Sequence, residues 1–549
     1  MSLRFTGLAG LWLLWTLAQL AFRPLLPVDE TRYLAVAYEM WQRGDFWVPY
    51  LNGQPYSHKP PLLFWLIHLS WAVLGVNEWS ARCIGPLAAL GVMRCVSGLA
   101  RQLWPMQDEV PDRTLLMLFG LIGFQLYGSL TLFDMVLTLF VVGAWSLLYR
   151  ASQQPSILTW LLLGVTLAGG ILTKGPVVLI YVLPMALTVR YWLAPAQGMP
   201  KRWWTGLVLS LLLAVLLALA WALPAAQAGG EAYREAIFWG QTAGRVVDAF
   251  DHRLPWWWYA PHLLWLLFPW AYWLPLWRGV RQLPGSEAGV RLCLIIVSGA
   301  WLVLMLLSGK RAHYLLPAMP AVALVLARAS VFLPVQQTRP RLMMVTVGMG
   351  LLFAVLTCLN QQWGWLLQGS LSVYWGLGLS VLALLAFWYA KPARGQVMLA
   401  LSVMSAGMTW LVMFGYVSFL ALAIDMRPAA HALAALREQG RELAYFDRYH
   451  GQYTFYAKLP NGLNIVRNVW DYVCEHPEAI LLHDYRKPGF WADDVVFDRY
   501  PYRSQEVVFL ENRLLRARPA LLADIYGKQP MPMAHYDFAC LPITPAGQS

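Results

Sequence analysis

The stretch TGLVLSLLLAVLLALAWALP, residues 205–224, decides the fold class of this chain. It contains no charged side chain, and it is long enough to cross the hydrocarbon core of a bilayer as one helix. Similar apolar runs of about 17–25 residues recur along most of the sequence. Of the 549 residues, 59% are hydrophobic and only 13% are charged. The sequence therefore predicts a mainly α-helical protein that crosses a membrane about 13 times.

The net charge of +12 does not indicate a nucleic-acid partner. Most Lys and Arg residues stand in short loops between apolar runs, where they set membrane orientation. Thirty Trp and twenty-five Tyr suit the belts that such proteins place at the two membrane surfaces. We therefore expect contacts with membrane lipids, no nucleic acid, and a monomer.

The distribution of Lys and Arg predicts which loops face the cytoplasm. Five short loops carry these cations: Arg150; Arg190, Lys201 and Arg202; Arg278, Arg281 and Arg291; Arg339 and Arg341; Lys391 and Arg394. If these loops face inward, the loops between them face outward, and so does the tail from residue 424. An inward N-terminus with an outward tail requires an odd number of crossings. We assign the apolar run 62–78 to a helix that lies at the interface, which leaves an odd count.

The first apolar run ends near Phe22 and has no small-residue cleavage site after it. We therefore interpret it as a retained first helix rather than a removed signal peptide. The expected location is the inner membrane of a bacterium, with several spans and a periplasmic tail.

Residues 424–549 differ in character from the rest. DMRPAAHALAALREQG (425–440) predicts an amphipathic helix that ends at Gly440. Short apolar runs follow in ELAYFD, YTFYA, GLNIV, AILLHD and EVVFLE, and they predict the strands of a small α/β domain. We thus expect a transmembrane catalytic domain, 1–423, and a soluble periplasmic domain, 424–549.

The six cysteines do not indicate a metal centre. Cys474 and Cys540 lie in the tail, where an oxidising compartment would allow a disulfide, although two cysteines in one domain are more often unpaired. Cys83, Cys95, Cys293 and Cys358 lie in apolar runs and suit packing. No zinc-ligand spacing, Walker loop, dinucleotide fingerprint or internal repeat is present in the sequence.

Polar residues gather in the outward loops. PVDETRY (27–33) carries Asp29 and Glu30, and QPYSHKPPLLFW (54–65) carries Lys59. Asp134 stands at the outer start of a span, where a carboxylate needs water or a partner; the alternative is an interfacial anchor. Lys174 could simply reach to the interface with its long side chain. The long outer loop holds Arg245, Asp248, Asp251, His252 and Arg253, and a later one holds Lys310, Arg311, His313 and Tyr314. The long loop is interpreted either as a basic clamp for a lipid phosphate at headgroup depth or as a Trp/Tyr belt with solvated charges.

Acids and cations at one membrane face suit the transfer of a sugar from a lipid phosphate. Cations stabilise the charge that develops on the leaving phosphate, and a carboxylate takes the proton of the acceptor hydroxyl. Nucleotide sugars are absent outside the cell, so a polyprenyl-linked donor is expected.

The motifs also resemble those of the C-type-fold (GT-C) glycosyltransferases, over about residues 1–320. The resemblance rests on DETRY, the run from Tyr56 to Trp65, NEWSAR, FDMVLTLF, LTKGP, the run from Arg253 to Tyr259 with PW at 269–270, and KRAHYLLP. The most similar branch comprises aminoarabinose transferases that act on lipid A and protein O-mannosyltransferases. In the former a Glu often precedes the Lys of the K-P segment, whereas here the residue is His58.

This resemblance implies a function and a set of roles. It implies transfer of a sugar, of the 4-amino-4-deoxy-L-arabinose type, from undecaprenyl phosphate to lipid A or another envelope glycan, with protein O-glycosylation as the alternative. Asp29 would be the general base with Glu30 in support, and Asp134 the second acid. Lys59 and Arg253 would hold the donor phosphate, with weaker assignments for Lys174, Lys310 and Arg311. Further candidates for substrate contact are Arg32, Tyr33, Tyr56, His58, Arg245, His252, Tyr259 and Tyr314.

We further expect Asp29, Lys59, Asp134 and Arg253 to share one outward cavity, and direct displacement to invert the anomeric centre. No cofactor is expected; a divalent metal is left open but not favoured. Two other classes are a transporter or flippase, which predicts mid-span charges and repeated halves, and a structural envelope protein, which needs no such motifs.

Overall fold

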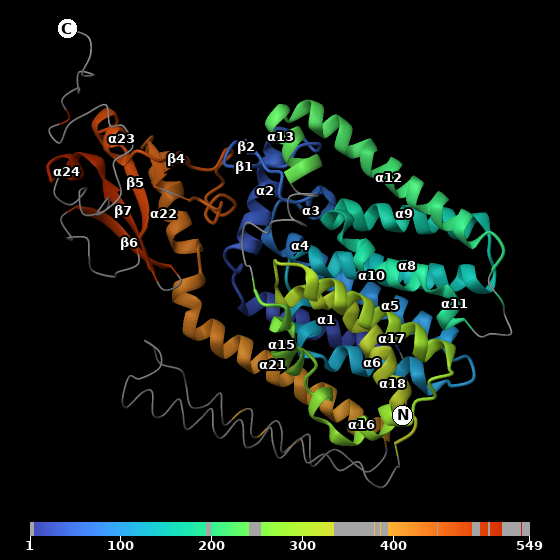
Figure 1. Cartoon of the computed structure of the whole chain (residues 1–549). Helices are drawn as coiled ribbons and strands as arrows, with labels where there is room; N and C mark the ends of the chain where they lie inside the picture. The colour runs from blue at the N-terminus through green and yellow to red at the C-terminus, as the bar shows by residue number, and fades with distance from the viewer. Residues whose placement is uncertain are drawn as a thin grey trace. The chain divides into compact units, whose positions relative to one another are not determined.

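The computed structural model describes residues 5–193, 198, 200–240, 254–333, 378, 381, 385, 394–446, 448–485, 495–502, 505–518 and 540. The chain forms two compact units (Figure 1). Unit 1 comprises residues 1–23 and 57–416, and unit 2 comprises residues 24–56 and 417–549. The predicted boundary at residue 424 stays a prediction about the domains; the unit that contains the tail also takes in residues 24–56.

Unit 1 is built from helices. Its α-helices are α1 (Phe5–Phe22), α3 (Leu62–Leu74), α4 (Glu78–Arg82), α5 (Ile84–Leu103), α6 (Glu109–Gly120), α7 (Ile122–Gly128), α8 (Phe133–Gln153), α9 (Ile157–Lys174), α10 (Val178–Leu187), α11 (Val189–Trp192), α12 (Trp203–Ala228), α13 (Glu231–Glu235), α15 (Tyr259–Leu266), α16 (Leu274–Arg281), α17 (Ala288–Leu306), α18 (Met319–Ser330) and α21 (Arg394–Ile424), which continues into unit 2. Short helical turns are η1 (Gly175–Val177), η3 (Ala236–Gly240), η4 (Trp256–Trp258), η5 (Trp270–Tyr272) and η6 (Ala312–Ala318).

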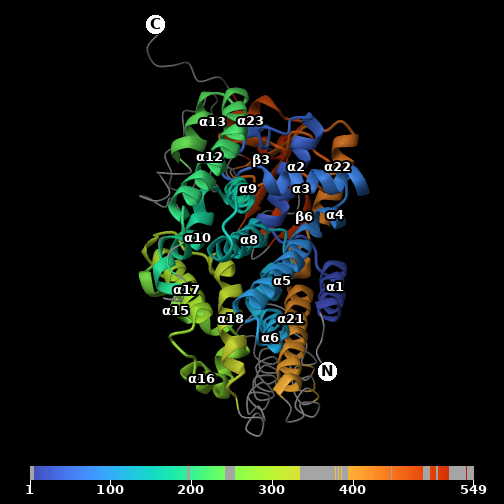
Figure 2. The same cartoon turned by 90° about the vertical axis from the view of Figure 1, so that its right-hand side faces the viewer.

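Neighbouring helices of unit 1 pack in a continuous series. α12 packs on α9, α9 on α8, α8 on α5, α5 on α6 and α6 on α18, and the order can be followed in both views (Figure 1 and Figure 2). Close packing is helped by small residues: a Cβ at Gly206 of α12 would lie 2.1 Å from the Trp160 ring of α9. The interior of the series is apolar, with Leu163, Val141 and Trp145 fully buried.

Seven helical stretches of the described residues are long and apolar enough to cross a membrane. They are Phe5–Phe22, Glu78–Leu103, Phe133–Gln153, Ile157–Leu187, Trp203–Ala228, Ala288–Leu306 and Ala312–Ser330. The predicted number of about 13 spans stays a prediction, because residues 334–377 lie outside the described part. The interfacial assignment of 62–78 also stays a prediction; α3 has 13 residues, which is about 20 Å of helix against a hydrocarbon core of about 30 Å.

Unit 2 begins with a helix and a hairpin. α2 (Asp29–Arg43) is amphipathic, and its residues Leu34, Ala35, Val36 and Met40 are fully buried. β1 (Tyr50–Leu51) and β2 (Gln54–Pro55) pair antiparallel across Asn52–Gly53. Both turn residues have positive φ, 55° and 74°, which is the requirement that makes Asn-Gly the favoured two-residue hairpin turn.

The rest of unit 2 is a five-stranded mixed sheet between helices, in the order β4-β3-β5-β7-β6. The strands are β3 (Leu443–Phe446), β4 (Asn464–Val466), β5 (Ile480–Tyr485), β6 (Val496–Tyr502) and β7 (Gln505–Glu511). β3 is parallel to β4 and β5, and β7 is antiparallel to β5 and β6. Alternate residues of a strand enter two cores: Ile480 and Leu482 belong to the core with α22 (Arg427–Glu438), and Leu481 to the core with α23 (Val469–Glu475). α24 (Asn512–Arg516) follows β7.

The mainly α-helical fold with a small sheet near the C-terminus is confirmed. The helix predicted to end at Gly440 is α22, and Gly440 has φ +75°. The predicted strand YTFYA is wrong, because residues 453–457 form turns. β6 was not predicted; it contains Pro501 and lies at the edge of the sheet, where a strand tolerates proline. Cys474 and Cys540 form a disulfide, so the expectation that favoured unpaired cysteines is wrong.

Candidate functional site

The centre of the candidate site in unit 1 is an ion pair between Asp134 and Lys174. Lys174 Nζ donates to Asp134 Oδ1 over 2.5 Å, and the two side chains are only 9% and 6% exposed. Asp134 lies in the first turn of α8, and Lys174 is the last residue of α9. A carboxylate at a helix N-terminus and a cation at a C-terminus both match the helix dipole.

The sequence fixes both ends of this ion pair locally. α8 and α9 are joined by the short loop 154–156 and pack against each other, so their far ends meet. Gly175 follows Lys174 with φ +70°, and Pro176 comes next, which stops α9 at the lysine. Thr138 adds support, because its hydroxyl donates to the carbonyl of Asp134 over 2.7 Å.

His313 and Tyr314 of η6 complete the surroundings of the ion pair. His313 Nε2 lies 3.8 Å from Asp134 Oδ2. Lys174 Nζ lies 4.4 Å from the centre of the Tyr314 ring, within the range of a cation–π interaction. The rings of His313 and Tyr314 meet edge to face with centroids 5.0 Å apart. Among the described residues, Asp134 therefore has Lys174 as a direct partner and His313 as a second basic group within reach.

Two further cations, Lys59 and Arg311, belong to the same cluster. Lys59 Nζ lies 5.8 Å from the ring centre of Phe133, the residue before Asp134, and its charge acts on Asp134. Tyr127 of α7 packs edge to face on His313 at 5.7 Å and lies within the electrostatic range of both Asp134 and Arg311. Lys59 is half-buried and Arg311 is exposed, so both can meet a ligand from solvent.

Two buried tyrosines, Tyr181 and Tyr259, contact Tyr314 and the Arg311 backbone. The Tyr181 hydroxyl of α10 donates to the Tyr314 carbonyl over 2.6 Å. Tyr259 is fully buried next to the Arg311 backbone and Tyr314. We call the set Lys59, Tyr127, Asp134, Lys174, Arg311, His313 and Tyr314 the Asp134 cluster.

In unit 2, Asp29 opens α2 and forms a separate polar group. Arg32 Nη2 donates to Asp29 Oδ1 over 2.5 Å, and the Tyr33 hydroxyl donates to the same oxygen over 3.4 Å. Tyr56 lies within the electrostatic range of Arg32. The Asp29 side chain is 42% exposed, which leaves it accessible to a proton donor.

Glu30 lies in a different environment from its neighbour. It is 1% exposed, and its Oε2 accepts the N–H of Leu26 over 2.9 Å. This contact closes the turn that leads into α2. Glu30 therefore has a structural role at the start of α2. Its predicted support of Asp29 stays a prediction.

Two other predicted residues, Lys310 and His58, are not members of the Asp134 cluster. Lys310 is 2% exposed and donates to the carbonyl of Leu307 in its own loop. Burial lowers the pKa of Lys310. His58 is exposed. Arg245, His252 and Arg253 lie outside the described residues, and the predicted four-residue cavity stays a prediction.

Sequence reasoning assigned no role to three members of the site. His313 was noted in KRAHY without a function, and Tyr127 and Tyr181 were missed because they resemble belt aromatics. The signal for His313 was its position two residues after Arg311, one of the cations carried over from the family motif.

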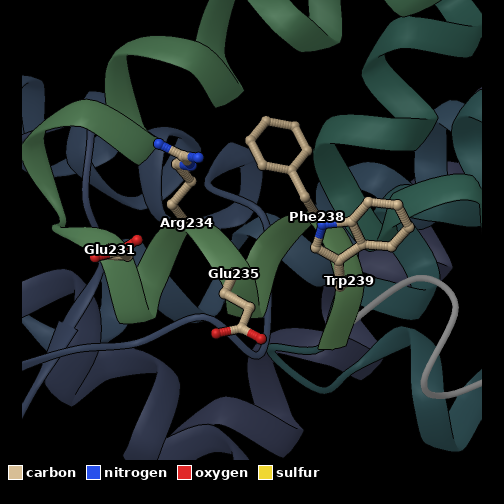
Figure 3. A pocket seen from close by; sticks show the side chains of 5 residues that line it. All are labelled: Glu231, Arg234, Glu235, Phe238 and Trp239. Carbon is tan, nitrogen blue, oxygen red and sulfur yellow. The ribbon is translucent and has the colours of Figure 1, made fainter.

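Over the described ranges, no group of three His, Cys, Asp or Glu side chains could hold a metal ion. A pocket of about 590 Å³ is lined by Glu231, Arg234, Glu235, Phe238 and Trp239. Figure 3 shows that all five side chains come from one helical stretch, α13 with η3. None of these five residues belongs to the Asp134 cluster.

Part of the Asp134 cluster lies within a sequence family match. Residues 58–225 match the family described as dolichyl-phosphate-mannose-protein mannosyltransferase. This range contains Lys59, Asp134 and Lys174. It covers less than a third of the chain.

Curated relatives with one activity match a longer range. An undecaprenyl phosphate-alpha-4-amino-4-deoxy-L-arabinose arabinosyl transferase of Pseudomonas aeruginosa (strain UCBPP-PA14) is 32% identical over 322 residues, 55% of each chain. Its namesake in Pectobacterium atrosepticum is 31% identical over 343 residues, 59% of each chain. The matches thus span little more than half the length of these relatives.

A solved structure covers nearly the whole chain. It is ArnT from Cupriavidus metallidurans bound to undecaprenyl phosphate, with a TM-score of 0.73 over 92% of this chain and 97% of that one. The chain has the ArnT fold. The sequence identity is 17%, so the likeness concerns the fold. The predicted GT-C fold and the resemblance to aminoarabinose and O-mannosyl transferases are confirmed by these matches.

Proposed function

We propose that the protein is a membrane glycosyltransferase that moves a sugar from an undecaprenyl phosphate carrier to lipid A at the periplasmic face, with a sugar of the 4-amino-4-deoxy-L-arabinose type. The observation that carries the proposal is the Asp134 cluster. It sets Lys174 and Lys59 near the Asp134 carboxylate, and it places the charge of Arg311 within range of Tyr127. Within this group positive charge is in excess, which suits a phosphate ligand.

In the proposed step, the acceptor hydroxyl oxygen forms a bond with the anomeric carbon, and the bond from that carbon to the phosphate oxygen breaks. The electron pair leaves with undecaprenyl phosphate, and the hydroxyl proton goes to a carboxylate, for which we propose Asp29. Lys59 and Arg311 stabilise the charge that develops on the phosphate. Lys174 is held by Asp134 and the Tyr314 ring, so it acts from a fixed position.

The periplasmic placement of the tail is part of this proposal. The disulfide between Cys474 and Cys540 supports it, because such bonds persist in oxidising compartments and are rare in the cytosol. The donor and acceptor then meet on the side of the membrane where nucleotide sugars are absent.

A second candidate is transfer to a protein hydroxyl. The match of residues 58–225 to the protein mannosyltransferase family favours it. Both candidates share the donor chemistry and differ in the acceptor.

Intact-mass analysis of lipid A and of surface glycoproteins tests the choice, in cells with and without the protein. We expect lipid A to gain the mass of one sugar only when the protein is present. A gain on protein instead would establish the second candidate, and no gain on either would refute both. In a reconstituted assay, Asp29→Asn should lower transfer by ~10²–10⁴-fold, the contribution of a general base.

A further inference from the structure

A turn-rich segment of the tail contacts α2 and the β1–β2 hairpin within unit 2. We call this segment, residues 449–462, the tail loop. Asn52 Nδ2 donates to the Tyr449 carbonyl over 2.9 Å. Arg43 Nη2 donates to Asn461 Oδ1 over 2.8 Å. The two ends of the tail loop therefore hold the turn of the hairpin and the end of α2.

Aromatic contacts join the middle of the tail loop to α2. The Tyr38 and Phe455 rings meet edge to face with centroids 5.9 Å apart, and both side chains are buried. Lys458 Nζ lies 5.2 Å from the Tyr38 ring centre and 4.2 Å from that of Phe455. The backbone of Lys458 is in turn held, because Arg437 of α22 donates to its carbonyl over 2.7 Å.

Two glycines allow the tail loop to approach this closely. A Cβ at Gly451 would lie 2.8 Å from Leu51 Cδ1 and 2.9 Å from Ala35 Cβ of α2. A Cβ at Gly462 would lie 2.6 Å from Asn52 Oδ1. Both glycines also have positive φ. The fit between tail loop and α2 is thus backbone against side chain, with no space for an added methyl group.

Glu39 of α2 fixes the hairpin from the other side. Its Oε1 accepts the N–H of Asn52 over 2.7 Å, and its Oε2 accepts that of Gly53 over 2.9 Å. Glu39 is fully buried. Helix, hairpin turn and tail loop are therefore one hydrogen-bonded block.

We propose that the tail loop is a positioning element for the acid-bearing helix: it fixes α2, and with it Asp29, although it contributes no reacting group. The inference rests on the proposed function, because the position of Asp29 matters only if Asp29 acts. A helix is stiff along its length, so a block that holds its C-terminal half at Tyr38, Glu39 and Arg43 also orients its first turn. The tail would then determine turnover rather than donor affinity.

Gly451→Ala tests this in the full-length protein, with Gly440→Ala as its matched control. Both glycines lie in unit 2 and have φ near +75°, so alanine introduces similar backbone strain at each. Only at Gly451 does the added Cβ meet α2, since nothing lies within 4 Å of a Cβ at Gly440. We expect kcat to fall by about 10–100-fold in Gly451→Ala, because misplacement by about 1 Å has effects of this size. The KM for the donor and binding of undecaprenyl phosphate should match those of Gly440→Ala.

Hydrogen exchange gives a readout that does not depend on activity. The amides of residues 29–56 should exchange faster in Gly451→Ala than in Gly440→Ala. Equal exchange in the two variants would overturn the inference whatever the activity. If Gly451→Ala fails to fold, Asn52→Gly replaces it, since it keeps the positive φ and removes the bond to Tyr449; a fall in kcat with unchanged lipid binding is again expected.

The inference and the proposed function fail in different ways. If Asp29→Asn is inactive while Gly451→Ala turns over like Gly440→Ala, the tail loop does not position Asp29 and the proposed function stands. If Asp29→Asn is fully active, the role of Asp29 is wrong, and the inference falls with it.

Discussion

Lys174→Met should destabilise unit 1 strongly, because it leaves the Asp134 carboxylate buried without its direct partner. Asp134 is 6% exposed, and its bond to Lys174 Nζ is 2.5 Å long. Removal of one member of a buried ion pair typically costs about 3–5 kcal/mol. His313, 3.8 Å away, and Lys59 remain near the carboxylate, so we expect a value near the lower end, about 3 kcal/mol.

The double variant Asp134→Asn/Lys174→Met separates stability from function. It removes both charges, and replacement of a whole buried pair by neutral groups is often close to neutral, here within about 1 kcal/mol of the wild type. A double-mutant cycle then isolates the coupling between the two side chains. Equilibrium unfolding in detergent measures stability, and binding of undecaprenyl phosphate to the same preparations measures function.

If Lys174 also holds the donor phosphate, the double variant should recover stability but not lipid affinity. A Lys174→Met protein as stable as the wild type would refute the ion-pair reasoning. A double variant that binds the lipid normally would refute the phosphate role of Lys174 and leave it a structural partner of Asp134.

Three further outcomes are expected. Lys59→Ala and Arg253→Ala should each weaken undecaprenyl phosphate binding by ~1.5–3 kcal/mol, the range for a hydrogen bond to a charged group. A variant that keeps both the melting temperature and the lipid affinity of the wild type would contradict this. Burial raises the pKa of Glu39 above its ordinary value of 4.5, so the protonated form is favoured in the folded state. The melting temperature of the wild type, measured relative to that of Glu39→Gln, should therefore fall as pH rises from 4.5 through the raised pKa of Glu39. A difference in melting temperature that does not change with pH would contradict the raised pKa. Single cysteines at 440–450 should react with an impermeant thiol reagent in intact cells, and those at 195–200 should not; the reverse would overturn the orientation.

The sequence predicted the members of the Asp134 cluster better than their contacts. Asp134 stood out because a carboxylate at a span end requires water or a partner, whereas Lys174 was assigned only through the family resemblance. Their pairing could also have been anticipated, since they lie at similar distances on either side of the short loop 154–156, and two packed antiparallel helices bring such positions together. The approach of His313 depends on how η6 packs on α8, which no local pattern encodes.

The tail shows where periodicity is insufficient. α22 was predicted because its apolar spacing and Gly440 agree with each other. YTFYA has the composition of a strand, yet Tyr453 and Phe455 are buried in the tail loop instead of a sheet. Tertiary contacts with α2 decide this conformation, and α2 is more than 400 residues earlier in the chain. β-propensity cannot report such contacts, because it measures only the fit to a pleated surface.

Asp134 of unit 1 and Asp29 of unit 2 differ in their surroundings, and this difference bears on the role proposed for each. Asp134 is 6% exposed and held by Lys174, so its negative charge is already neutralised inside the membrane unit. Such a carboxylate is a poor general base, because taking a proton would leave Lys174 without its partner in a desolvated place. The Asp29 side chain is 42% exposed, whereas that of its partner Arg32 is 20% exposed, so the Asp29 carboxylate meets solvent on one side. Asp29 is therefore the more accessible of the two carboxylates, which agrees with its proposed role as the base, while Asp134 is committed to Lys174.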